Sequence, residues 1–199
     1  MNDDGSEGAG GAGDGEATDG SGPDRADAPP ENDGRRFDRL PATPDGRVVP
    51  GRPARSEVLD WWAERFGIEP ATFADHGFWE KGRGKVWAVH DAVEHPDPSR
   101  IEALGMTVLR TRGEHWKPTT NAVQRFGGAA TRNVIRLDAD EAARFVAGED
   151  VETAWDGDWG YLIAEHDPGG GPAPLGVGLY LHGELRSQIP TGRRQEHRL

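Results

Sequence analysis

Three runs of apolar, strand-forming residues follow one another near the C-terminal end of the chain, at residues 160–164, 175–181 and 184–189. A turn-rich segment separates the first two runs, and only His182-Gly183 separates the second from the third. Because so short a connection joins antiparallel neighbours, the sequence predicts consecutive hairpins. Three neighbouring strands expose an apolar face and sheet edges that must be covered or closed. We therefore expect these strands to close a small β-barrel.

The N-terminal segment has the opposite character. Its first 34 residues carry ten carboxylates, one arginine, nine glycines and no large apolar residue after Met1. Such a segment has nothing to bury against the entropy of ordering, so we predict an acidic disordered tail, continued as a linker or surface arm to residue 55. The tail carries −9 of the total charge of −12, which leaves −3 for residues 35–199. Its acidity is compatible with a halophilic cell and equally with a regulatory tail.

Two absences limit the classes of protein that this chain can represent. The chain has no cysteine, which excludes disulfides, thiolate metal sites and a cysteine nucleophile. No apolar run reaches the length of a membrane span, and the acidic start is unlike a signal peptide. We expect a soluble, cytoplasmic protein without a membrane partner.

Residues 56–113 predict a small α+β unit. Ser56 is a candidate N-cap for an amphipathic helix that ends at Gly67, and its paired tryptophans are core residues or, alternatively, a base-stacking pair. Two strands follow around a basic, glycine-rich tip at residues 81–85, which could contact phosphate or, alternatively, is an ordinary solvated loop. A short helix from Asp97 and a strand over 106–112 complete the unit.

Residues 114–199 predict a second unit. A helix follows Thr119, a strand covers 133–137, and Asp138 with Glu141 forms a capping box for a further helix. A strand over 151–154 precedes the three C-terminal runs. The fold class is therefore α+β, with a small α/β segment followed by a mixed β-barrel.

A basic stretch near the predicted boundary is the candidate binding surface. Within the 27 residues from 110 to 136 the only acidic side chain is Glu114, and the cationic residues are Arg110, Arg112, Lys117, Arg125, Arg132 and Arg136. Arg193 and Arg194 repeat the bias near the C-terminus. Guanidinium groups bind phosphates bidentately and stack on bases, so the composition favours an RNA surface. The alternative is that these arginines pair with carboxylates and cover the barrel.

Polar and aromatic side chains between the basic ones could add selectivity. The hydrogen-bonding candidates are Thr119, Asn133, Ser187 and Gln188, which suit 2′-hydroxyls and base edges. Tyr180 and Trp116 are candidate stacking platforms. Alternatively, the polar side chains cap turns and the tyrosine is half-buried packing.

Signatures of catalysis are weak. Gly176-Val177-Gly178 lies within a strand pattern and lacks the third glycine of a dinucleotide loop, so it favours barrel curvature or close approach of an RNA backbone. The seven histidines form no metal-binding motif, and the carboxylates lie in caps and loops. We expect no catalytic residue, no metal and no cofactor.

An ordered set of short pieces carries a family resemblance. The pieces are Lys117-Pro118-Thr119, Phe126-Gly127, Arg132-Asn133-Val134, Leu137, Glu141, Phe145, Gly148-Glu149, Gly160-Tyr161, Leu175-Gly176-Val177-Gly178 and Ser187-Gln188-Ile189-Pro190. Together they resemble the C-terminal RNA-binding region of the Sun/Fmu-type RNA cytosine-5 methyltransferases, a PUA-like domain preceded by a small α/β segment. The resemblance spans residues 56–193 and is clearest over 115–190.

The resemblance implies a targeting module without its enzyme, because the chain has neither the catalytic cysteine nor room for the domain that binds S-adenosylmethionine. It implies recognition of structured rRNA or tRNA, with no DNA, by a non-catalytic factor in ribosome biogenesis or RNA modification. A separate RNA-modification enzyme is then a second partner. The alternative is a protein-interaction subunit of such an enzyme. An RNA-modifying enzyme of unknown chemistry stays a third possibility.

Overall fold

The computed structural model describes residues 37–82, 84–93 and 102–194, and the described chain has an α+β fold, as predicted. Two five-stranded sheets and three α-helices make up its regular elements, together with short 3-10 turns at Pro44–Gly46, Pro70–Phe73, Gly127–Ala129 and Thr191–Arg193. The tail predicted over residues 1–34 and the start of the helix predicted at Asp97 lie outside the described residues.

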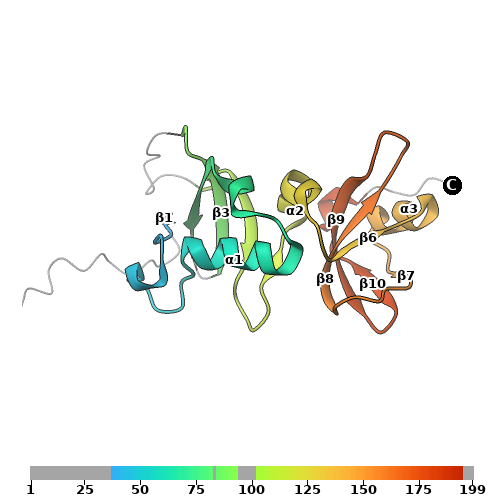
Figure 1. Ribbon diagram of the computed structural model, residues 1–199, viewed down its shortest axis with the longest axis horizontal. Coiled ribbons are helices and arrows are strands. Elements are labelled where there is room, and N and C mark those ends of the chain that lie inside the picture. The colour runs from blue at the N-terminus through green and yellow to red at the C-terminus, as the bar shows by residue number, and fades with distance from the viewer. Residues whose placement is uncertain (1–36, 83, 94–101, 195–199) are drawn as a thin grey trace, which may run out of the picture. The chain divides into compact units, whose positions relative to one another are not determined.

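The first sheet is antiparallel throughout, in the order β1-β2-β3-β4-β5. Its strands are β1 (Asp38–Arg39), β2 (His76–Glu80), β3 (Lys85–His90), β4 (Met106–Arg110) and β5 (Lys117–Pro118). Figure 1 shows helix α1 (Arg55–Phe66) running across this sheet. The hairpin of β2 and β3 and the return of β4 follow the sequence prediction.

The ends of α1 show one correct and one wrong prediction. Gly67 terminates the helix in the left-handed conformation with φ 65°, as expected. The N-cap is Ala54 rather than Ser56, and the Glu57 carboxylate accepts the Ala54 backbone N–H at 2.7 Å. A glutamate at the third helical position therefore supplies the cap that a hydroxyl residue was expected to provide.

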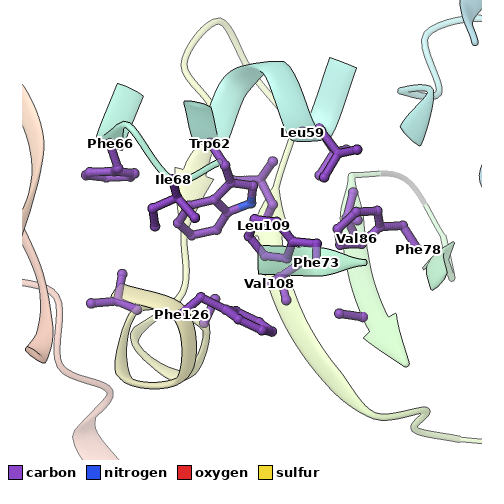
Figure 2. Close-up of a cluster of buried hydrophobic side chains, with 14 of the residues drawn as sticks. Leu59, Trp62, Phe66, Ile68, Phe73, Phe78, Val86, Val108, Leu109 and Phe126 are labelled. Carbon is purple, nitrogen blue, oxygen red and sulfur yellow. The ribbon is translucent and has the colours of Figure 1, made fainter. Parts of the chain in front are cut away.

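The core of the first sheet is built around one tryptophan. Figure 2 shows the Trp62 indole projecting from α1 into a cluster that includes Phe73 and Phe126. Trp62 is fully buried, which confirms the core interpretation for this member of the tryptophan pair. Trp61 is only half-buried, and its ring centroid lies 6.4 Å from that of Trp116.

The folded part begins earlier than the predicted Ser56. Phe37 and Leu40 are buried, and β1 between them pairs with β2. Arg52, only 8% exposed, donates to Glu80 at 2.6 Å and to Asp38 at 3.0 Å. The sequence did not predict this packing, because the segment has few apolar residues and several prolines. Its buried Arg52 is stabilised by Asp38 and Glu80, which are distant from it in the sequence.

The predicted boundary after residue 113 does not separate the cores. Strand β5 pairs with β4, so it belongs to the first sheet. Helix α2 (Thr120–Phe126) buries Ala122 and Val123 in the same cluster as Trp62, and it also packs against β9 (Ala173–Leu181) of the second sheet. Helix α2 therefore joins the two sheets rather than capping only one of them.

The second sheet has the order β6-β8-β9-β10-β7. Its other strands are β6 (Val134–Arg136), β7 (Val151–Glu152), β8 (Gly160–His166) and β10 (Glu184–Ser187). Strand β6 is parallel to β8 and the remaining pairs are antiparallel, which confirms the mixed sheet and the consecutive C-terminal strands. Helix α3 (Ala139–Ala147) packs against β7, β8, β9 and β10.

Helix α3 begins with the predicted capping box. Asp138 accepts the Glu141 N–H at 2.8 Å, and Glu141 accepts the Asp138 N–H at 2.9 Å. Its end is at Gly148, whose φ of 87° is left-handed. Both ends were readable from local sequence because the partners lie within four residues of one another.

Two glycines allow side chains of the neighbouring segment to lie over β9. A Cβ at Gly178 would lie 2.4 Å from Leu185 Cδ1, and a Cβ at Gly176 would lie 2.5 Å from Ile189 Cδ1. Protein atoms already fill the space above both glycines, so an RNA backbone cannot approach β9 there. The strand pairing is open rather than closed, since β6 and β7 do not pair within the described residues.

Candidate nucleic-acid interface

Three cationic residues lie side by side across the first sheet, and we call them the basic row: Lys85, Arg110 and Lys117. Lys85 is the register partner of Arg110, and Arg110 is the register partner of Lys117. Residues directly opposite one another in an antiparallel pair project from the same face, about 5 Å apart. The sheet therefore sets three positive charges in a line. Lys85 and Arg110 are exposed and Lys117 is half-buried.

The turn before β3 fixes one end of the basic row. Gly84 has φ 78°, and a Cβ added there would lie 2.7 Å from the Arg112 Cβ. Its N–H donates to the Glu80 carboxylate at 2.8 Å, and its carbonyl accepts the Thr111 N–H at 2.9 Å. These contacts require glycine and bring the exposed Arg112 next to the tip. Arg83 lies outside the described residues.

The basic row has no neutralising partner in the part of the chain that the structure describes. Neither Lys85, Arg110 nor Lys117 forms an ion pair with any residue that the structure describes. Burial, and secondarily the charge of Arg110, lowers the pKa of Lys117. Like charges directly opposite one another destabilise a sheet, so an anion bound here would relieve a repulsion that the folded chain sustains.

Lys117 connects the basic row to the second sheet. Its ammonium group donates to the side-chain carbonyl of Gln188 and lies 5.9 Å from the centre of the Tyr161 ring. Lys117 and Gln188, both predicted as site residues, are thus brought together from positions 71 residues apart. Since Gln188 is neutral, the contact orients the ammonium group without cancelling its charge.

Other predicted arginines lie elsewhere or have partners. Arg136 donates to the Glu165 carboxylate at 3.0 and 3.2 Å, which is the pairing alternative. Arg132 donates to the Glu64 carbonyl at 3.4 Å, and Arg193 donates to the Gln124 side chain at 3.4 Å. Arg125 lies on the same helix as Gln124 and is exposed. The predicted set therefore does not gather into one patch of free guanidinium groups.

Three of the predicted polar site residues donate their side-chain hydrogen bonds to backbone carbonyls of the protein itself. Asn133 is 8% exposed and donates from its side-chain amide to the Arg65 carbonyl at 2.6 Å. The Thr119 hydroxyl donates to the Thr107 carbonyl at 2.6 Å and caps α2. The Ser187 hydroxyl donates to the Phe145 carbonyl at 2.8 Å. The turn-capping alternative holds for Thr119, and backbone anchoring describes the other two.

Tyr180 and Arg194 also have structural contacts. Tyr180 is 6% exposed and donates its hydroxyl to the Thr153 carbonyl at 3.2 Å, so it is not a stacking platform. The Arg194 Nε donates to the Ile189 carbonyl at 3.4 Å, while the side chain lies over Gly148. The sequence shows Tyr180 between two leucines in a strand, but it does not show which face of the strand is buried.

Sequence reasoning left Lys85 out of the site, although it completes the basic row. The signal was present: a strand that starts at Lys85 and pairs antiparallel with one that ends at Arg110 places the two residues together. The sequence places Lys85 at a basic tip but does not show which residue of another strand lies opposite it. The missing information is the register between β3 and β4, which are not joined by a tight turn.

Comparison with known families agrees with this architecture. Residues 132–195 match the family model described as the methyltransferase RsmF PUA domain. The second sheet and α3 therefore form a PUA-like domain, as the resemblance implied. Residues 24–105 match a family of unknown function (DUF7122). No curated protein matches the chain.

Among the residues that the structure describes, no helix is long and apolar enough to cross a membrane. Within the same residues, no group of three or more histidine, aspartate and glutamate side chains is arranged to hold a metal ion.

Proposed function

We propose that this protein recognises structured RNA, either rRNA or tRNA, through a surface centred on the basic row. A PUA-like domain points to RNA binding in the context of RNA modification. The single observation that carries the proposal is the line of three cations on β3, β4 and β5, next to that domain and without an ion-pair partner among the described residues. Phosphate groups are the ligands whose negative charge suits such a line.

The contacts of Lys117 support a shared surface for both sheets. The ammonium group is held by Gln188 of the second sheet while Arg110 adjoins it on the first. A folded RNA that neutralises this row therefore also meets the end of β10. Arg112 beside Gly84 extends the positive surface at the opposite end.

We further propose that the protein acts without catalysis, as a factor in ribosome biogenesis or RNA modification. The chain carries no cysteine for a thiolate attack on a cytosine ring. A separate RNA-modification enzyme then supplies the chemistry in the cytoplasm, and this protein supplies the recognition. The alternative role is that of a protein-interaction subunit of such an enzyme.

The test is binding of fluorescently labelled tRNA and of rRNA fragments to the full chain, measured by anisotropy. The informative variant combines Lys85→Gln, Arg110→Gln and Lys117→Gln. Its matched control combines Arg136→Gln, Arg144→Gln and Arg186→Gln, because these arginines pair with Glu165, Glu149 and Glu184 and the net charge changes equally. The proposal predicts that the first variant loses at least tenfold in affinity and the second much less. Equal losses would assign binding to net charge alone.

A further inference from the structure

An open pocket of about 840 Å³ lies beside the basic row and differs from it in character. It is bounded by α1, by residues 114–116, and by β8 and β9. Its volume lies within the roughly 300–1,000 Å³ of small-molecule and cofactor sites. The pocket can therefore hold an extended group rather than a single ion.

The walls of the pocket are aromatic. Trp61 and Trp116 lie with ring centroids 6.4 Å apart and planes tilted by 37°. Tyr161 lines the same space, and Trp159 is 61% exposed, which is unusual for so large an apolar side chain. The edge contact of Trp159 with His182, at 5.0 Å, leaves most of the indole accessible. Exposed aromatic faces of this kind attract cations.

The rim of the pocket is acidic. Asp60 and Glu64 lie one helical turn apart on α1, and Glu114 lines the pocket from the loop before β5. All three are exposed, and none forms an ion pair with a residue that the structure describes. Their charges are therefore available to a ligand.

Arg65 lines the pocket, and its guanidinium group is hydrogen-bonded to backbone carbonyls. The Arg65 guanidinium donates to the Tyr161 carbonyl at 2.8 and 3.0 Å and to the Trp159 carbonyl at 3.1 Å. Burial lowers the pKa of Arg65. These bonds tie α1 to the start of β8 and hold the pocket floor, while the rim keeps an excess of negative charge.

We propose that this pocket binds an arginine-bearing segment of a basic partner protein. Guanidinium groups stack on indole faces and form bidentate bonds to carboxylates, so they match both the walls and the rim. RNA is the less suitable occupant, because its phosphates would face the carboxylates of Asp60, Glu64 and Glu114. The protein thus presents a basic row for one partner and an acidic, aromatic pocket for another.

The test uses the full chain and a fluorescein-labelled octapeptide that contains four arginines, with a peptide of the same length carrying citrulline in their place. Anisotropy reports the affinity of each. Trp159→Ala removes an aromatic wall without changing the charge. We expect it to lower the affinity for the arginine peptide about threefold to tenfold. Glu64→Gln is expected to lower the affinity for the same peptide about threefold. The matched controls are Val48→Ala and Asp45→Asn, both on exposed residues outside the pocket.

Three results would overturn this assignment. One is equal binding of the arginine and citrulline peptides. Another is an affinity that falls no further in Trp159→Ala than in Val48→Ala. The third is that Trp159→Ala leaves peptide binding unchanged but abolishes binding of single-stranded RNA. This result would show that the pocket binds bases. The proposed RNA function is judged separately, because the glutamine substitutions in the basic row should leave the affinity for the arginine peptide undiminished.

Discussion

Arg110 and Lys117 lie directly opposite one another at the adjoining ends of β4 and β5, and both are positively charged. No carboxylate among the described residues pairs with either side chain. A free sheet would be more stable with one of these charges removed. The proposed RNA function would account for this arrangement, because a bound phosphate group would neutralise part of the positive charge.

We predict that Arg110→Gln does not destabilise the free protein. Relief of the repulsion should leave the free energy of unfolding unchanged or raise it by up to about 1 kcal/mol. Urea denaturation measures this change, and RNA affinity should fall in the same variant. A loss of stability of more than about 1 kcal/mol would show that Arg110 has a structural role.

We predict that Arg52→Ala destabilises the protein strongly, because it removes the buried 2.6 Å ion pair with Glu80 and the 3.0 Å pair with Asp38. Breaking a buried pair costs about 3–5 kcal/mol. Arg39→Ala is the control, since Arg39 pairs with Asp91 at 3.3 Å with 61% of its side chain exposed. Its cost should stay below about 1 kcal/mol. Similar costs in urea denaturation would contradict the packing of residues 37–53 on the first sheet.

Asn133 supports a third prediction, about stability rather than binding. Its φ is 54° and its side-chain amide donates to the Arg65 carbonyl at 2.6 Å. Asn133→Ala loses the bond and strains the backbone, at a cost of about 2–4 kcal/mol. Asn133→Gly loses only the bond and should cost about 1–3 kcal/mol. Thermal unfolding should rank wild type, glycine and alanine in that order, and an alanine variant as stable as wild type would contradict the anchoring role.

His76 gives a prediction about pH. Burial, followed by the charges of His90 and Arg125, lowers its pKa below 6.5, and its Nδ1 is buried without a hydrogen-bond partner in the described chain. In the unfolded state the ring takes up a proton below about pH 6.5. The unfolded state then binds more protons than the folded one, so stability falls as pH drops below 6.5.

The measurement compares the free energy of unfolding at pH 7.5 and pH 5.5. His76→Gln should lose less stability over this interval than wild type. His115→Gln is the control, because His115 is exposed. If all three proteins lose the same amount, His76 does not contribute to the acid sensitivity.

Local signals in the sequence predicted most of the regular elements. The capping box at Asp138 and the glycine stops at Gly67 and Gly148 act over a few residues, so each was readable without the fold. The start of the folded part was not, because Arg52 is buried by carboxylates from β1 and β2. Burial of a charge depends on long-range partners that composition does not reveal.

The candidate site was only partly predictable for the same reason. Composition identified Arg110 and Lys117 but could not show that Arg136 is paired or that Tyr180 faces inward. Lys85 enters the site only through strand register. Residue type therefore suggested the chemistry, while pairing across the sheet decided which side chains are free to perform it.

The most direct test of the basic row as an RNA-binding surface is the salt dependence of RNA affinity. We expect log affinity of the full chain for tRNA to fall linearly with log salt concentration. In the protein carrying Lys85→Gln, Arg110→Gln and Lys117→Gln, the slope should be shallower by about two to three, since about 0.7–0.9 counterions are released per phosphate contact. A slope that is unchanged in this variant would contradict the account.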